Sequence, residues 1–155
     1  MLELAPPASP DPNAHVVLLG RAYLDMVLAG HKRLEARLSS HRIVPFGRVA
    51  PGDVLWFRAV GGGYAARAVA SDVHSFESLR PADVHRLRCR FGPLVTAPAG
   101  FWQARRRARY ATFIGLDRVE PVAGGPALAK KPGDRRAWIV LGPAGGLSRA
   151  APIAA

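Results

Sequence analysis

The chain of 155 residues has little of what a disulfide framework or a membrane span requires. Its one cysteine, Cys89, excludes an intramolecular disulfide and a cysteine-based zinc site, which is typical of a protein from a reducing cytoplasm. No apolar run approaches the ~18 residues of a membrane-spanning helix. No basic segment followed by an apolar one begins the chain, so we expect no signal peptide.

Motifs for metals, cofactors and nucleophiles are also missing. The histidines form no His-x-x-x-His pair and lie beside no carboxylate cluster; they are His15, His31, His41, His74 and His85. The glycines 61–63 lack the Lys-Ser/Thr that follows a phosphate-binding loop, and there is no Gly-x-Ser-x-Gly elbow. The sequence therefore predicts no metal and no cofactor.

Lysine is scarce, but arginine is not: 22 basic residues stand against 11 acidic ones, giving a net charge of +11. Such an excess predicts a polyanionic partner, most simply nucleic acid. A GC-rich genome also favours arginine, so the placement of the charges is more informative than their total. Between residues 84 and 116 there are seven arginines and no acidic residue. This concentration indicates a binding surface, with a solvated helix face as the alternative.

Short apolar runs separated by glycine and proline predict a chain made mainly of strands. We expect strands at 15–19, 54–60, 64–73, 110–119 and 137–141. The pattern of 32–38 allows a helix or a strand, and we favour a turn that leads into a strand, because only one residue separates it from Gly30. We expect short helices at 21–29, at 81–88 with Ser78 as a cap, and at 99–108. No regular helix–strand alternation supports a doubly wound sheet. The fold class predicted is therefore α+β, mainly β: a small β-barrel decorated with short helices.

The organisation along the chain is that of a single domain. Residues 1–14 contain four prolines and no hydrophobic period, and we expect a flexible lead-in there. Residues 15–141 hold all the predicted elements. The Gly, Pro and Ala-rich residues 142–155 are expected to form a loose tail.

The segment Gly30-His31-Lys32-Arg33-Leu34-Glu35-Ala36-Arg37 can support chemistry. A lysine in a cleft binds an anion or, if it is desolvated, acts as a base, and a nearby carboxylate orients it or transfers a proton. Residues three apart on a strand face opposite sides, so Lys32 and Glu35 converge only if Lys32 lies in the turn after Gly30. The alternative is an exposed, salt-bridged strand.

The second such segment runs from Phe101 to Tyr110 and is Phe-Trp-Gln-Ala-Arg-Arg-Arg-Ala-Arg-Tyr. On a helix, one side would combine an indole with guanidinium groups: Trp102, Arg105, Arg106 and Arg109. Such a surface stacks on bases and pairs with phosphates. The equally weighted alternative has Trp102 in the core and the arginines solvated.

The order of these elements is similar to that of a known family. A strand, a short helix, Gly30-x-Lys32-x-x-Glu35-x-Arg37, a loop, and Gly52-Asp53 before an apolar strand resemble the ASCH domain of the PUA-like superfamily. The stretch 101–111 and the closing Trp-Ile-Val-Leu at 138–141 resemble a subgroup of it. The similarity spans roughly residues 15–141.

The resemblance implies a PUA-like β-barrel with a cleft beside the Gly-x-Lys-x-x-Glu-x-Arg segment. Members of the family are thought to bind RNA or modified nucleosides, and some are hydrolases. One relative removes the acetyl group of N4-acetylcytidine, and another cleaves RNA. The first uses a lysine, a threonine three positions on and a distant glutamate. Lys32 matches that lysine, but Glu35 stands where the threonine would be.

We therefore expect a cytoplasmic domain that binds RNA or a nucleotide in a basic cleft. The expected contacts are Lys32, Arg37, Trp102, Arg105, Arg106, Arg109 and Tyr110. A metal-independent hydrolase acting on RNA or a modified nucleoside is the second hypothesis, with Lys32 and Glu35 as its catalytic residues. A binder of a small acidic metabolite is the third. We expect no membrane contact.

Overall fold

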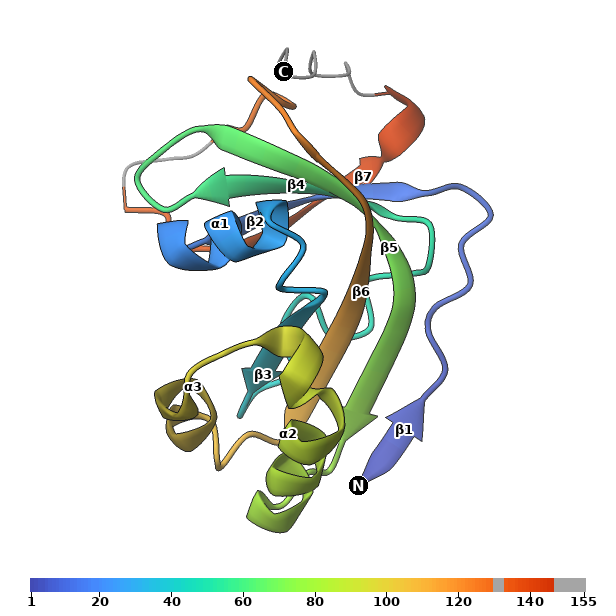
Figure 1. The fold of residues 1–155 in the computed structure, drawn as a ribbon. Coiled ribbons are helices and arrows are strands. Elements are labelled where there is room, and N and C mark those ends of the chain that lie inside the picture. The colour runs from blue at the N-terminus through green and yellow to red at the C-terminus, as the bar shows by residue number, and fades with distance from the viewer. Residues whose placement is uncertain (130–132, 147–155) are drawn as a thin grey trace.

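The computed structural model describes residues 1–129 and 133–146 as one curled, mixed sheet with three short helices (Figure 1). The strands are β1 (Leu2–Leu4), β2 (Asn13–Leu19), β3 (Leu34–Ser39), β4 (Val54–Ala59), β5 (Tyr64–Glu77), β6 (Tyr110–Pro121) and β7 (Trp138–Pro143). The helices are α1 (Arg21–Leu28), α2 (Pro81–Val95) and α3 (Ala99–Ala104), and a 3-10 turn follows at Ala144–Gly146. The predicted α+β, mainly β class is confirmed.

The sheet has the strand order β3-β6-β5-β4-β2-β7, and β1 pairs with β5 beside this path. Only β2 and β4 run parallel; the other pairs are antiparallel. The β5–β6 pairing shifts register twice, and such bulges bend and twist a sheet. In the described residues β3 and β7 are the two ends of the order, so the sheet forms a half-barrel with an open side.

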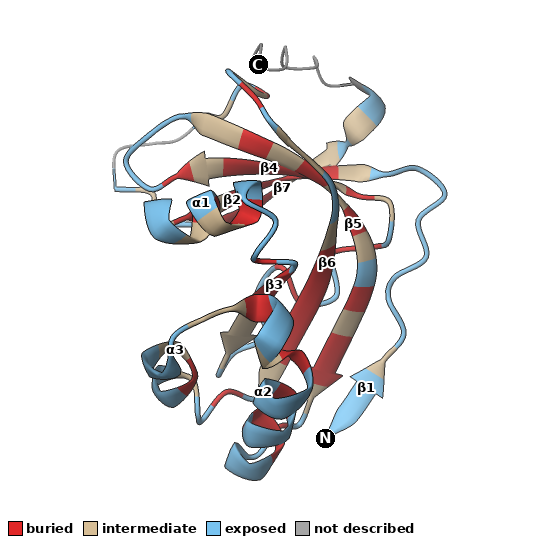
Figure 2. Cartoon of the chain, viewed as in Figure 1, coloured by how far each residue is buried: buried red, intermediate tan, exposed pale blue. Residues whose placement is uncertain are grey.

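Two apolar clusters stabilise the two ends of this half-barrel. One joins β2, β4 and β5 to α1 through residues such as Val17, Leu24 and Phe57. The other joins β3, β5 and β6 to α2 through residues such as Phe91 and Phe113, whose rings stack 4.3 Å apart. Figure 2 shows that buried positions follow the strands, while the outer sides of α2 and α3 are exposed. The strands thus form the framework, and the helices close its ends.

The N-terminal lead-in contains more structure than its prolines suggest. Leu2–Leu4 form β1, paired antiparallel with the end of β5, and β2 already begins at Asn13. Alternation cannot be recognised in a strand of only three residues. At the other end β7 extends to Pro143, two residues beyond the predicted strand. Residues 147–155 of the predicted loose tail lie outside the described residues.

The helix boundaries differ from the predictions at α2 and α3. Arg80, not Ser78, is the N-cap of α2, and the carboxylate of Asp83 accepts a hydrogen bond from the Arg80 backbone N–H at 2.9 Å. The helix continues to Val95, because the apolar period 84–87–91–95 keeps facing the core. In contrast, α3 ends at Ala104 and not at 108, because a turn redirects the chain into β6.

Within the described residues no helix combines the length and the hydropathy needed to cross a membrane.

Candidate functional site

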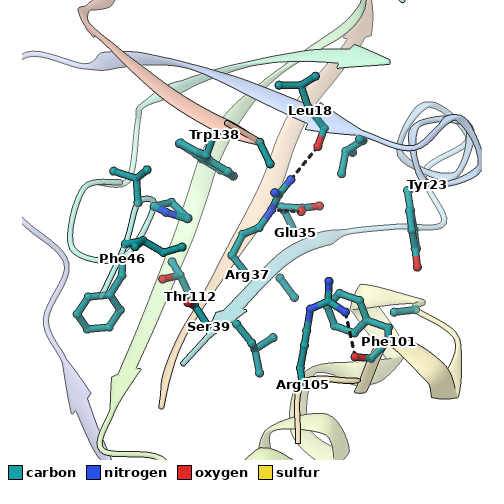
Figure 3. A pocket seen from close by; sticks show the side chains of 18 of the residues that line it. Leu18, Tyr23, Glu35, Arg37, Ser39, Phe46, Phe101, Arg105, Thr112 and Trp138 are labelled. Carbon is teal, nitrogen blue, oxygen red and sulfur yellow. Dashed lines mark hydrogen bonds and ion pairs between the residues drawn. The ribbon is translucent and has the colours of Figure 1, made fainter. Parts of the chain in front are cut away.

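A pocket of about 730 Å³ opens on the side where the half-barrel is not closed (Figure 3). It lies between the end of β2 and the start of β7 on one side and β3 and α3 on the other. Its cationic wall residues are Lys32, Arg37, Arg105, Arg135 and Arg136, and Glu35 is the single acidic residue of the lining among the described positions. A site with this charge balance favours an anionic ligand.

Lys32 and Glu35 meet inside this pocket, as the turn geometry predicts. β3 begins only at Leu34, so Lys32 lies in the turn after Gly30, whose φ is +77°. The Lys32 Nζ is 3.6 Å from Glu35 Oε2 and donates a hydrogen bond to the Val95 carbonyl at 3.0 Å. Both side chains are almost fully buried, with exposed fractions of 4% and 3%. The alternative of an exposed salt-bridged strand is therefore wrong.

Two cations share the carboxylate of Glu35. Arg37 Nε donates to Oε1 at 2.7 Å, whereas Oε2 accepts no hydrogen bond and has only the lysine near it. Burial lowers the pKa of Lys32, and the attraction of Glu35 only partly opposes this effect. Arg37 adds to the lowering through its like charge. Because a guanidinium does not deprotonate in proteins, Lys32 is the one of the two cations that loses its proton more readily.

Arg37 also links the two sides of the pocket. Its Nη2 donates to the Leu18 carbonyl of β2 at 3.0 Å, and its guanidinium lies 5.3 Å from the Trp138 ring of β7 (Figure 3). β3 and β7 are therefore connected by a side chain instead of a backbone ladder. This arrangement fixes the guanidinium next to an aromatic face, as in sites that stack a planar ligand.

The Trp138 ring is held from behind by a buried hydrogen-bond chain. Its indole N–H donates to His15 Nδ1 at 3.1 Å, and His15 Nε2 lies 2.8 Å from Asp53 Oδ2. Since Nδ1 accepts, the proton of the neutral ring is on Nε2 and is donated to the carboxylate. Asp53 also accepts the backbone N–H groups of Asn13 and Ala50, each at 3.0 Å. Burial alone would raise the pKa of Asp53, but these hydrogen bonds together lower it.

Arg105 and Phe101 form the opposite wall. The guanidinium of Arg105 lies 3.8 Å from the centre of the Phe101 ring, and its Nη1 donates to the Phe101 carbonyl at 3.0 Å. Burial lowers the pKa of Arg105, although an arginine stays charged at neutral pH. No carboxylate of the described chain pairs with this side chain. Arg105 is thus a cation held in place on the wall of the pocket.

Four of the predicted contact residues line the pocket together with Glu35: Lys32, Arg37, Arg105 and Tyr110. Trp102 does not; it is buried in the α2 cluster and stacks on Phe113 at 6.4 Å. Arg106 and Arg109 are exposed and outside the pocket. The predicted helical face does not exist, since α3 ends at Ala104. That face was to combine Trp102, Arg105, Arg106 and Arg109.

Several wall residues were not predicted. Sequence reasoning selected Trp102 although Phe101 forms the wall, and it missed Tyr23, whose ring lies 5.6 Å from Lys32 Nζ. His15 and Asp53 were not predicted to pair: His15 shows no metal-ligand spacing, and Asp53 belongs to the Gly-Asp pair before an apolar strand. The signal for His15 is a polar residue inside an apolar strand run. That pattern requires a buried hydrogen-bond partner, and Asp53 is that partner.

No cluster of metal-ligating side chains is found within 1–129 and 133–146. The pocket instead combines guanidinium groups, aromatic rings and a single carboxylate on a curled sheet. The fold and the site together define a curled half-barrel sheet with a cationic pocket at its open side.

The more particular identity of the fold comes from solved structures. An ASCH protein from Zymomonas mobilis matches 70% of this chain and 70% of its own length, with a TM-score of 0.57 and 18% identity. A serine-to-alanine variant of that protein matches 86% of this chain and 91% of its own, with a TM-score of 0.64 and 19% identity. No protein-family model and no curated protein matches the chain. The chain has the ASCH-domain fold.

Proposed function

We propose that this chain binds RNA or a nucleotide, with one unpaired base in the pocket beside β3. The observation that supports it most is the pair of opposed walls, in which Trp138 lies against Arg37 and Phe101 against Arg105. Aromatic rings and guanidinium planes are the surfaces on which proteins stack unpaired bases. A volume of about 730 Å³ is within the range of ligand sites, ~300–1,000 Å³.

The polar groups of the pocket suit the remaining parts of a nucleotide. Arg105 has no carboxylate partner in the described chain and retains donors for a phosphate. Glu35 lies at the inner surface of the pocket, and its buried Oε2 accepts no hydrogen bond, so this carboxylate suits a base amino group that enters deeply, the donor that carboxylates accept from cytosine. In this role Lys32 and Arg37 hold the Glu35 carboxylate in place from two sides.

Two changes of the pocket test this proposal, one of its shape and one of its charge. Ser39→Trp places a large ring at the β3 wall, and Arg105→Ala removes the cation of the opposite wall. We expect each variant to weaken binding of a fluorescein-labelled single-stranded RNA about 10-fold or more, as measured by anisotropy. Arg86→Ala is the control, since Arg86 is exposed on α2 and already paired with Asp83. Equal affinities for Ser39→Trp and the control would contradict base binding in the pocket.

Lys32 supports a second candidate function, a metal-independent hydrolase of RNA or of a modified nucleoside. An amine with a lowered pKa, 3.6 Å from a carboxylate, is suited to accept a proton from water. Incubation with RNA and with N4-acetylcytidine, followed by mass spectrometry, tests for turnover. Activity that persists with a chelator and disappears in Lys32→Met would support the hydrolase. No turnover of either compound would leave the binding function.

A binder of a small acidic metabolite, the third hypothesis, differs in salt dependence. Contacts with several phosphates weaken steeply as salt rises, with a slope of ~0.7 per contact for single strands. A single carboxylate ligand would give a shallow slope.

A further inference from the structure

We propose a second site, a phosphate-binding groove between α2 and α3 that holds the backbone of the RNA strand whose base occupies the pocket. The groove is lined by Pro81, Val84, His85, Arg88, Trp102, Gln103 and Arg106. This inference rests on the proposed function, because it extends the bound nucleotide into a strand.

The basic segment between residues 84 and 116 does not act as one uniform surface. Part of it is neutralised within the chain. Arg86 lies 3.3 Å from Asp83, which also lies 3.5 Å from Arg80. Arg90 lies 3.9 Å from Glu3 of the N-terminal strand. These arginines therefore have counter-charges and contribute less to binding an external anion.

The arginines at the groove differ in this respect. Arg88 and Arg106 have no carboxylate within 4.0 Å in the described part of the chain. Arg106 is oriented by a hydrogen bond from Nη1 to the Gln103 carbonyl at 3.1 Å, which leaves its other donors free. None of the residues that line the groove is acidic. Two guanidinium groups without counter-charge beside one hollow favour an anion there.

The size of the groove indicates what kind of group it takes. Its volume of about 120 Å³ is several times the ~30 Å³ that one water occupies in the liquid. It is well below the ~300 Å³ at which pockets begin to hold drug-sized ligands. The groove therefore fits a phosphate group and not a base. The buried Trp102 forms part of its lining, which is a role in keeping with its place in the core.

The two hollows are neighbours through the turn after α3. Arg105 lines the pocket, and the next residue, Arg106, lines the groove. A strand with a base against Arg105 thus passes over this turn and brings a neighbouring phosphate to Arg106. The base in the pocket must be unpaired, so the partner is single-stranded RNA and not a duplex.

The double variant Arg88→Ala/Arg106→Ala tests the groove. Its control is Arg86→Ala/Arg90→Ala, which removes the same charge from exposed positions that already have carboxylate partners. Binding of an unstructured single-stranded RNA of about 12 nucleotides is measured by anisotropy. Salt is varied from about 0.05 to 0.2 M. We expect the groove variant to lose roughly 25-fold in affinity at 0.1 M salt and about 1.4 units of salt slope, since two phosphate contacts are lost. The control should lose much less of both.

The outcomes separate this inference from the proposed function. If the groove variant and the control bind RNA equally while Ser39→Trp binds weakly, the groove is not a phosphate site and the pocket function stands. If the groove variant binds weakly but Ser39→Trp binds like the parent, the groove holds RNA without a base in the pocket, and the proposed function is wrong. If the parent does not bind the RNA at about 0.05 M salt, the groove proposal and the binding of RNA in the pocket are both wrong. A duplex bound as tightly as the single strand would also overturn the inference.

Discussion

Glu35 should be indispensable for stability only as long as Lys32 is present. The Lys32 ammonium is 3.6 Å from Glu35 Oε2, and at an effective dielectric constant of about 20 this separation is worth about 4–5 kcal/mol of attraction. Glu35→Gln removes that attraction and leaves a buried ammonium beside Arg37. Loss of one partner of a buried pair costs about 3–5 kcal/mol. The variant can also fold with Lys32 deprotonated. Removing the proton from a lysine with a pKa of about 10.4 costs roughly 5 kcal/mol at pH 7, so the loss of stability cannot exceed this value.

Lys32→Met should be tolerated, in contrast. Glu35 keeps its hydrogen bond from Arg37 at 2.7 Å, and the Val95 carbonyl keeps the one donated by Thr96 Oγ1 at 2.7 Å. The Glu35 carboxylate keeps Arg37 as its counter-charge, although its Oε2 loses the nearby ammonium, and a thioether replaces a desolvated charge. We expect a change within about 1 kcal/mol. The double variant Lys32→Met/Glu35→Gln should recover most of the stability that Glu35→Gln alone loses.

Urea unfolding of the four proteins completes this double-mutant cycle. The pH dependence adds a second readout. Because the folded pKa of Lys32 is lowered, the unfolded state binds more protons between that pKa and about 10.4, so stability rises with pH in this window. The penalty of Glu35→Gln should therefore shrink between about pH 7 and 9.5, and the double variant should not show this gain. A loss below about 1 kcal/mol in Glu35→Gln, or no rescue by Lys32→Met, would refute the reasoning.

The remaining predictions concern the framework of the pocket. Asp53→Asn places an amide among the donors of His15 and two backbone N–H groups, and should cost about 2–4 kcal/mol in urea unfolding. Since the pKa of Asp53 is lowered, the stability that its carboxylate contributes is complete above about pH 4 and is lost as the pH falls through the folded pKa. The Tm of the parent should therefore drop in acid more steeply than the Tm of Asp53→Asn. An equal drop would contradict this. Gly115→Ala should cost about 1–3 kcal/mol, because its Cβ would clash with Ser71 Oγ and approach the Asp72 backbone N to 3.2 Å. An unchanged Tm of Gly115→Ala would show that β5 moves to accommodate the methyl group and would contradict this prediction.

The pocket wall formed by Lys32 and Glu35 could be predicted because the two residues are close in sequence. Gly30 ends α1 in a left-handed conformation, so Lys32 falls in a turn and Glu35 on the strand that follows. This spacing alone brings the two side chains together. The strands other than β1 were predicted for a similar reason, since apolar runs bounded by glycine and proline depend on neighbouring residues only.

The contact between Trp138 and Arg37 could not be predicted because it depends on the order of the strands in the sheet. Trp138 reaches Arg37 only because β7 joins β2 at one end of the sheet while β3 joins β6 at the other. Nothing in the spacing of the chain indicates that order. In α3, six residues are too few for a face to be recognised, so Phe101 and Trp102 could not be told apart. Alanine and arginine are good helix formers, so the sequence predicted a helix to residue 108 although the chain turns after Ala104.

The burial of Lys32, Glu35 and Arg37 follows from the open side of the half-barrel. In a closed barrel, backbone hydrogen bonds would join β3 to β7, and apolar side chains would fill the interior. Here Arg37 makes the connection instead, to the Leu18 carbonyl and the Trp138 ring. Well-packed apolar residues often stabilise a fold as much as a buried ionic group or more. Under the proposed function, the three residues serve ligand binding more than stability. This view requires that Lys32→Met, which should fold as well as the parent, binds RNA more weakly.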